Sequence, residues 1–164
     1  MNNVTLLGMP GAGKSTIGVL LAKQLGYDFL DTDLSIQKRE GMLLREIIAK
    51  KGLAEFKKIE EEVNAAVMVD HTVIAPGGSV IYGEKAMEHL SEISTVVYLK
   101  LSYESLKARL GKNLKKRGVV FENGQTLEDL YRERVPLYEK YADVSIDTDG
   151  LDIGSVLEKV LQNL

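Results

Sequence analysis

The chain has 164 residues, of which 45% are hydrophobic and 27% charged, and its formal net charge at pH 7 is −3. This length and composition are typical of one compact globular domain, and the acidic balance argues against nucleic acid as the main partner. The absence of cysteine excludes disulfides and thiolate metal sites.

No apolar run approaches the roughly 20 residues that a bilayer-spanning helix needs, and the N-terminus lacks the basic and apolar regions of a signal peptide. We therefore expect a cytoplasmic protein that binds neither membranes nor nucleic acid and acts as a monomer. The two histidines, His71 and His89, are too far apart in sequence to suggest a histidine-rich metal site.

Short apolar runs alternate with amphipathic stretches through the first half of the chain. Apolar residues at helical spacing indicate helices, and Gly26 stands where a helix-ending glycine is expected. The predicted elements are, in order, a strand at 4–7, a helix at 14–25, a strand at 27–30, a helical stretch at 34–51 broken near Gly41, and a helix that carries Phe56, Ile59, Val63 and Val67.

The alternation continues to the end of the chain. Regular alternation of strands and helices predicts an α/β fold with a parallel five-stranded sheet covered by helices on both faces. The predicted elements are a strand at 72–75, a helix at 84–90, a strand at 95–99, helices at 102–110 and 127–141, a strand at 144–146 and a helix at 153–161.

Residues 8–15, with the sequence GMPGAGKS, match the phosphate-binding motif G-x-x-x-x-G-K-[ST] between a predicted strand and a predicted helix. Glycines let successive backbone N–H groups point at a phosphate, and the helix N-terminus adds its positive dipole end. We expect Lys14 to reach the β- and γ-phosphates of ATP and Ser15 to ligate Mg²⁺. The nucleotide-binding residues predicted here are Gly11, Ala12, Gly13, Lys14, Ser15 and Thr16.

Two further segments follow predicted strands, so they should face the same edge of the sheet. Of Asp31 and Asp33, we expect one to orient the Mg²⁺ shell and the other to bind the acceptor hydroxyl as its base. The alternative for Asp33 is a helix N-cap. Gly77 and Gly78 either allow a substrate close to the backbone or form a plain turn.

The class of nucleotide enzyme is narrowed by what the chain lacks. A GTPase would carry the base-reading motif Asn-Lys-x-Asp, which is absent. The sequence at 147–150, DTDG, fits the loose D-x-x-G pattern but follows the last predicted strand, so we interpret it as a turn. An ATP-dependent kinase is the better class, while a non-catalytic ATP-binding regulatory module is an alternative.

Together these motifs resemble the shikimate kinase family in order and spacing over nearly the whole chain. The resemblance implies a P-loop fold of the nucleoside monophosphate kinase type, a single domain over residues 1–164 with a mobile lid at about 111–125, and a role in aromatic amino acid biosynthesis. The matching segments are LDTD at 30–33, EFKKIEE at 55–61, PGGS at 76–79, the basic loop at 111–125 and RVPLY at 134–138.

The resemblance also implies roles for single residues. Asp31 would lie near the metal, and Asp33 would bind the substrate hydroxyls. Arg134 would bind the substrate carboxylate, and Arg109 would lie against adenine. Arg117, with Lys116 as second choice, would cover the phosphates and take part in catalysis. From the sequence alone, Arg134 could be a helix surface charge, and the basic run around 107–117 a solvated face.

The chain departs from the family pattern at Lys57, where the family has an arginine that also binds the substrate carboxylate, and at Ser79, which stands at the third glycine. Pro76 precedes the glycine pair. Lysine offers a point charge and cannot make a planar two-pronged contact. Shikimate is the acceptor that the resemblance implies, bound by Asp33, Lys57, Gly77, Gly78 and Arg134. Another small hydroxy acid or an amino acid alcohol is the alternative.

Overall fold

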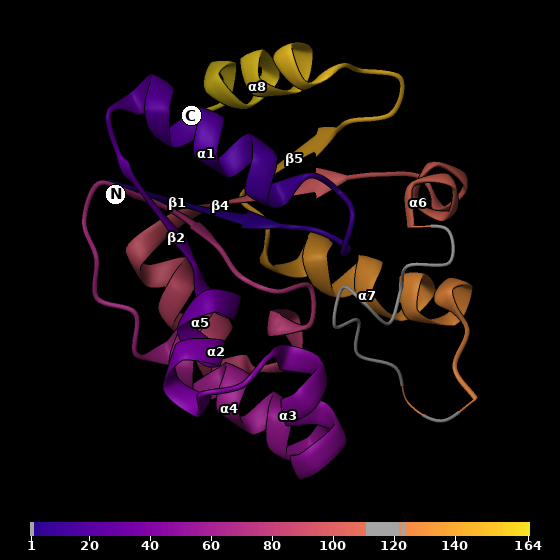
Figure 1. Ribbon diagram of the computed structural model, residues 1–164. Helices are drawn as coiled ribbons and strands as arrows, with labels where there is room; N and C mark the ends of the chain where they lie inside the picture. Colours follow the sequence, from indigo (N-terminus) through magenta and orange to yellow (C-terminus); the bar gives the residue numbers. More distant parts are fainter. Residues whose placement is uncertain (1, 111–121, 123) are drawn as a thin grey trace.

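The computed structural model describes residues 2–110, 122 and 124–164 (Figure 1). Its centre is a parallel sheet of five strands in the order β2-β3-β1-β4-β5. The first strand along the chain is thus the middle strand of the sheet, with β3 and β4 on either side. The strands are β1 (Asn3–Leu7), β2 (Asp28–Asp31), β3 (Thr72–Ala75), β4 (Ser94–Lys100) and β5 (Val144–Asp147).

Helices cover both faces of the sheet. Figure 1 shows α1 and α8 on one face and α5 and α7 on the other, with α2, α3 and α4 forming a separate group beyond α5. The helices are α1 (Lys14–Leu25), α2 (Thr32–Glu40), α3 (Leu44–Lys51), α4 (Leu53–Ala65), α5 (Glu84–Ile93), α6 (Tyr103–Leu110), α7 (Leu127–Tyr141) and α8 (Ile153–Gln162), and a 3₁₀ turn, η1, spans Val80–Tyr82.

Successive side chains of β1 point to opposite faces, and they divide the core in two. Leu6 packs with Ile17 and Val156 in the cluster beneath α1 and α8. Leu7 packs with Met87 and other buried residues in the cluster beneath α5 and α7. A third cluster joins α2, α3 and α4 to one another. Both faces of the central strand are therefore buried, as the apolar run at its position predicts.

The predicted α/β fold and its five parallel strands are confirmed. The helical stretch predicted at 34–51 is two helices, and Gly41 ends the first of them with φ 67°. That helix begins at Thr32, two residues before the predicted start. The turn at 147–150 is also confirmed, since the N–H of Asp149 donates to the Asp147 carboxylate at 3.1 Å. Within the described residues, every helix is too short or too polar to span a lipid bilayer.

Candidate active site

A cleft of about 450 Å³ opens where β1, β2 and β3 end. Parallel sheets place ligand sites at the carboxyl ends of their strands, and the cleft lies at that edge. The phosphate loop, the acidic pair, the glycine pair and one residue of α7 meet there. Its wall consists of Pro10, Gly11, Gly13, Lys14, Ser15, Thr16, Asp31, Asp33, Leu44, Phe56, Glu60, Ala75, Pro76, Gly77, Gly78, Ser79 and Arg134.

The phosphate loop connects β1 to α1, as the motif predicts. Gly11 (φ 85°) and Gly13 (φ 92°) adopt the left-handed conformation that side-chain-bearing residues disfavour. Gly13 precedes α1, and no side chain caps that helix, so its first N–H groups face the cleft. The Lys14 ammonium donates to the carbonyls of Gly8 at 2.7 Å and Met9 at 3.0 Å, which holds it over the loop.

The two aspartates after β2 have different environments. Asp31 is the N-cap of α2, because its Oδ1 accepts the N–H of Asp33 at 2.9 Å and that of Leu34 at 3.4 Å. The alternative that Asp33 caps this helix is therefore wrong. Asp33 lies inside the first turn, and its Oδ1 is buried with no hydrogen-bond partner among the described residues. Burial and the charge of Asp31 raise the pKa of Asp33 to about 6, although Lys14 opposes the shift.

The glycine pair leaves room for side chains of the site itself. A Cβ on Gly77 would lie 2.7 Å from Oδ1 of Asp33 and 3.0 Å from Oε2 of Glu60. A Cβ on Gly78 would lie 2.9 Å from Pro10 and 3.0 Å from Nη1 of Arg134. Because real Cβ atoms do not approach other atoms so closely, a larger residue at either position would displace site residues. A plain turn does not explain both glycines.

Glu60 is a buried residue of the cleft that the sequence interpretation missed. It is 2% exposed, and its Oε1 accepts the hydroxyl of Ser79 at 2.5 Å. Burial and the nearby Asp33 charge raise its pKa to about 7, against the lowering effect of Ser79 and Arg134. The spacing could have revealed it, since Glu60 follows Phe56 by four residues and therefore lies on the buried face of α4.

Arg134 is 1% exposed, which excludes a helix surface charge. Burial alone would lower the pKa of its guanidinium, but the hydrogen bonds and electrostatic effects of Tyr138 and Tyr82 outweigh burial and raise that pKa. Tyr138 also donates to the carbonyl of Gly78 at 2.6 Å and stacks on Tyr98, with ring centroids 5.1 Å apart. Arg134 is thus held in the wall of the cleft by residues of α7 and η1.

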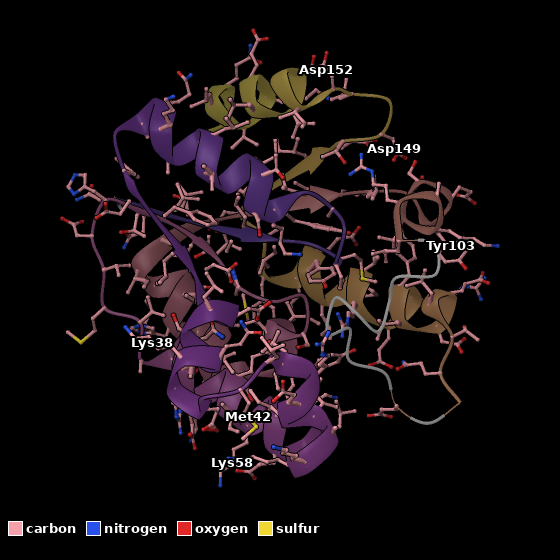
Figure 2. The ribbon with its side chains drawn as sticks, in the orientation of Figure 1. Lys38, Met42, Lys58, Tyr103, Asp149 and Asp152 are labelled. Carbon is pink, nitrogen blue, oxygen red and sulfur yellow. The ribbon has the colours of Figure 1, made fainter. Side chains whose placement is uncertain are left out.

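The other basic residues predicted for the site either lie around the cleft or belong to the part of the chain that the structure does not describe. Lys57 lines an adjoining hollow of about 180 Å³, and it is absent from the cleft wall itself. The Arg109 guanidinium donates to the carbonyl of Gly11 at 3.4 Å, so α6 contacts the phosphate loop. Asp149, in the turn after β5, accepts the N–H of Ser102 just before α6 (Figure 2). Arg117 and Lys116 lie outside the described residues.

The sheet order 2-3-1-4-5, with a phosphate loop after the middle strand and an acidic pair after β2, defines a P-loop kinase of the nucleoside monophosphate kinase type. The model of the family described as shikimate kinase matches residues 10–164. The chain belongs to the shikimate kinase family, whose members are ATP-dependent small-molecule kinases. The resemblance expected from the sequence is therefore confirmed.

Individual relatives agree over almost their full length. Shikimate kinase from Thermodesulfovibrio yellowstonii is 37% identical over 164 residues, which cover 99% of this chain and 94% of the relative. The solved structure of shikimate kinase from Acinetobacter baumannii in complex with shikimate has a TM-score of 0.88 at 32% identity, covering 99% and 92%. That of Aquifex aeolicus shikimate kinase has a TM-score of 0.80 at 29% identity, covering 98% and 94%.

Proposed function

We propose that this enzyme transfers the γ-phosphate of ATP to a ring hydroxyl of shikimate and forms shikimate 3-phosphate. The observation that carries the proposal is that one cleft joins the phosphate loop, a buried carboxylate and a buried guanidinium, through Lys14, Asp33 and Arg134. The relative from Acinetobacter baumannii was solved with shikimate bound, which supports this acceptor.

The nucleotide end of the cleft binds triphosphate through backbone and side-chain donors. The N–H groups of the loop and of the α1 N-terminus donate to phosphate oxygens, and Lys14 places its charge on the β- and γ-phosphates. Arg109 adds charge at the rim, since it already reaches the carbonyl of Gly11. The family resemblance implies that Arg117, which lies outside the described residues, would also act on the phosphates.

Mg²⁺ is expected to enter with ATP. Ser15 and Asp31 line the same end of the cleft and offer oxygen ligands, which Mg²⁺ prefers together with several waters. Among the described residues, no group of three or more histidine, cysteine or acidic side chains could hold a metal alone, which fits an ion that arrives with its phosphates. When bound, Mg²⁺ neutralises charge on the transferred group.

Asp33 is the base for the acceptor hydroxyl. With a pKa of about 6 its carboxylate is mostly ionised at neutral pH, so it can accept the hydroxyl proton as the oxygen attacks the γ-phosphorus. The new O–P bond forms while the bond between phosphorus and the β–γ bridging oxygen breaks. The proton ends on Asp33, and ADP leaves with the bridging oxygen. Gly77 keeps the carboxylate at this place, because nothing larger would fit beside it.

Arg134 binds the carboxylate of the acceptor, with Lys57 as a second and weaker charge. A buried guanidinium is a strong partner for a carboxylate, because it presents two parallel N–H groups. The position of Lys57 outside the cleft wall favours a second candidate function, in which the acceptor is a smaller hydroxy acid or an amino acid alcohol.

A coupled assay of ADP release tests the proposal. Wild-type enzyme with Mg·ATP should release ADP in proportion to added shikimate, and mass spectrometry should find one phosphate on the product. A parallel panel of small hydroxy acids and amino acid alcohols tests the second candidate. If shikimate stimulates no ADP release and a member of the panel does, the shikimate assignment is wrong and the kinase assignment holds.

A further inference from the structure

The ring of Tyr82 lies close to two cations that come from different helices. It is the last residue of η1, just after the glycine pair. The Lys57 ammonium of α4 lies 4.3 Å from the centroid of its ring, and the Arg134 guanidinium carbon of α7 lies 5.5 Å from the same centroid. Both distances are within the range of cation–π attraction, which extends to about 6 Å. One ring therefore contacts both cations assigned to the acceptor carboxylate.

The other partner of Lys57 is weak. Its ammonium lies 3.7 Å from Glu122, whose side chain is 69% exposed, and exposed ion pairs contribute little. The buried acid Glu60, which the Lys57 charge also influences, accepts the Ser79 hydroxyl at 2.5 Å. The described contact that orders the Lys57 head group is thus the aromatic face of Tyr82.

Tyr82 is itself held in place. Its hydroxyl donates to Glu133 of α7, and it also hydrogen-bonds with the Arg134 side chain. Burial and the Glu133 hydrogen bond raise its pKa to about 12, so the phenol stays neutral at physiological pH and keeps donating to Glu133. The ring is therefore a fixed surface, while a lysine side chain by itself has many rotamers.

The hollow that Lys57 lines adjoins the cleft. Glu60 and Ser79 line both spaces, so they form the boundary between them, and Tyr82 lines the hollow. Lys57 thus lines the hollow on one side of this boundary, and Arg134 lines the cleft on the other.

We propose that Tyr82 is a specificity-determining positioning residue, which holds Lys57 beside Arg134 so that both cations act on one acceptor carboxylate. The inference rests on the proposed function for the identity of that carboxylate. It explains how lysine can replace the family's arginine at position 57, because the Tyr82 ring supplies the orientation that a planar guanidinium would have by itself.

Kinetics with two acceptors test the inference. Wild-type enzyme should prefer shikimate to its uncharged carboxamide, and Tyr82→Leu should reduce this preference about tenfold through the KM for shikimate, as expected for a lost cation–π contact. The kcat and the KM for ATP should stay within twofold of wild type. Tyr82→Phe is the matched control: it keeps the ring against Lys57 and loses the hydroxyl's bonds to Glu133 and Arg134, so it should retain clearly more of the preference than Tyr82→Leu. An undiminished preference in Tyr82→Leu overturns the proposal.

Lysine NMR tests the positioning without any substrate. In wild-type protein the ring should shift the side-chain protons of Lys57 upfield relative to those of its neighbour Lys58, which points into solvent (Figure 2). Lys57→Arg identifies the signal. The shift should persist in Tyr82→Phe and disappear in Tyr82→Leu. If Lys57 and Lys58 resonate together in wild type, the proposal fails whatever the acceptor is. If the shift is present but shikimate is no substrate, Tyr82 positions Lys57 and only the proposed acceptor is wrong.

Discussion

The Oδ1 atom of Asp31 accepts the backbone N–H of Asp33 at 2.9 Å, so the first aspartate of the pair caps the helix in which the second one lies. This relationship separates two roles that the sequence leaves together. Asp31 stabilises the start of α2, and its Oδ1 is occupied by the backbone N–H groups that it accepts. Asp33 does not cap the helix, so its buried carboxylate can act as the base for the acceptor hydroxyl.

Asp33→Asn is expected to lower kcat by about 100-fold or more, because an amide cannot accept the hydroxyl proton. The KM for ATP should barely change. Thermal unfolding at pH 7 should show no loss of stability, since the cap belongs to Asp31 and a buried charge is removed. Asp31→Asn is the control for the helix, because asparagine is as good an N-cap as aspartate. Full turnover by Asp33→Asn would mean that another group takes the proton.

Gly77→Ala should displace Asp33, because the added Cβ would lie 2.7 Å from its Oδ1. We expect kcat with shikimate to fall about tenfold or more, since a small displacement of a catalytic group is costly. The matched control is Gly154→Ala in α8, where the added Cβ meets Asp152 at an ordinary 3.6 Å and alanine favours the helix. Steady-state kinetics of both variants check this, and equal activities would show that the cleft tolerates a side chain at Gly77.

The free energy of unfolding should depend on pH through the titration of the Glu60 carboxyl. Its folded-state pKa is about 7, against an ordinary value near 4.5 that applies to the unfolded chain. Between these pH values the folded protein holds a proton that the unfolded chain has lost, so stability falls as pH rises from 4.5 to 7. Asp33 acts in the same direction, with its pKa of about 6.

Glu60→Gln should therefore flatten that fall by about 3 kcal/mol, which is the scale of a shift of this kind. Urea unfolding at a series of pH values measures it. Glu62→Gln is the control on the same helix, because that side chain is exposed and paired with Arg39. If the free energy of unfolding falls with pH equally in wild type and Glu60→Gln, a group other than Glu60 causes the pH dependence.

Arg134→Lys should raise the KM for shikimate and lower the specificity constant by about one to two orders of magnitude, because charge-assisted hydrogen bonds contribute roughly 1.5–3 kcal/mol. The charge is retained in this variant, and the two-pronged contact is lost. The KM for ATP should stay constant. Arg132→Lys on the same helix is the control, since Arg132 is exposed and pairs with Glu128. If the two variants bind shikimate equally well, Arg134 does not contact the acceptor.

Lys14→Met should abolish measurable phosphoryl transfer while circular dichroism shows an intact fold. The loss follows from the charge that Lys14 places on the phosphates. Lys23→Met, at the exposed end of the same helix, should keep wild-type activity. Turnover by Lys14→Met within tenfold of wild type would contradict the assignment of the phosphate loop.

The strand and helix order follows from the sequence because hydrophobic periodicity and helix-ending glycines are local signals. The helices at Lys14–Leu25 and Leu127–Tyr141 have the predicted ends. The start of α2 was misplaced by two residues, because either aspartate could cap it by composition alone. Only the folded geometry decides that Asp31 does so.

The phosphate loop could be predicted because its residues are contiguous. Glu60 and Tyr82 were harder to recognise as site residues, since their contacts join segments that are far apart in sequence. The Ser79 hydroxyl meets Glu60 across 19 positions, and Tyr82 meets Glu133 across 51. The roles of single residues follow from such contacts, which no local pattern encodes.

The two tyrosines that contact Arg134 also make the acceptor end of the cleft visible to spectroscopy. The chain has no tryptophan, so its near-ultraviolet signal is dominated by tyrosine. Tyr82 and Tyr138 both hydrogen-bond with Arg134, and a carboxylate arriving there changes the electric field at two phenol rings. The described cleft wall around Lys14 contains no tyrosine. The near-ultraviolet signal of Tyr82 and Tyr138 should therefore detect acceptor binding without a label. These two residues are separate from the cleft wall that binds the nucleotide.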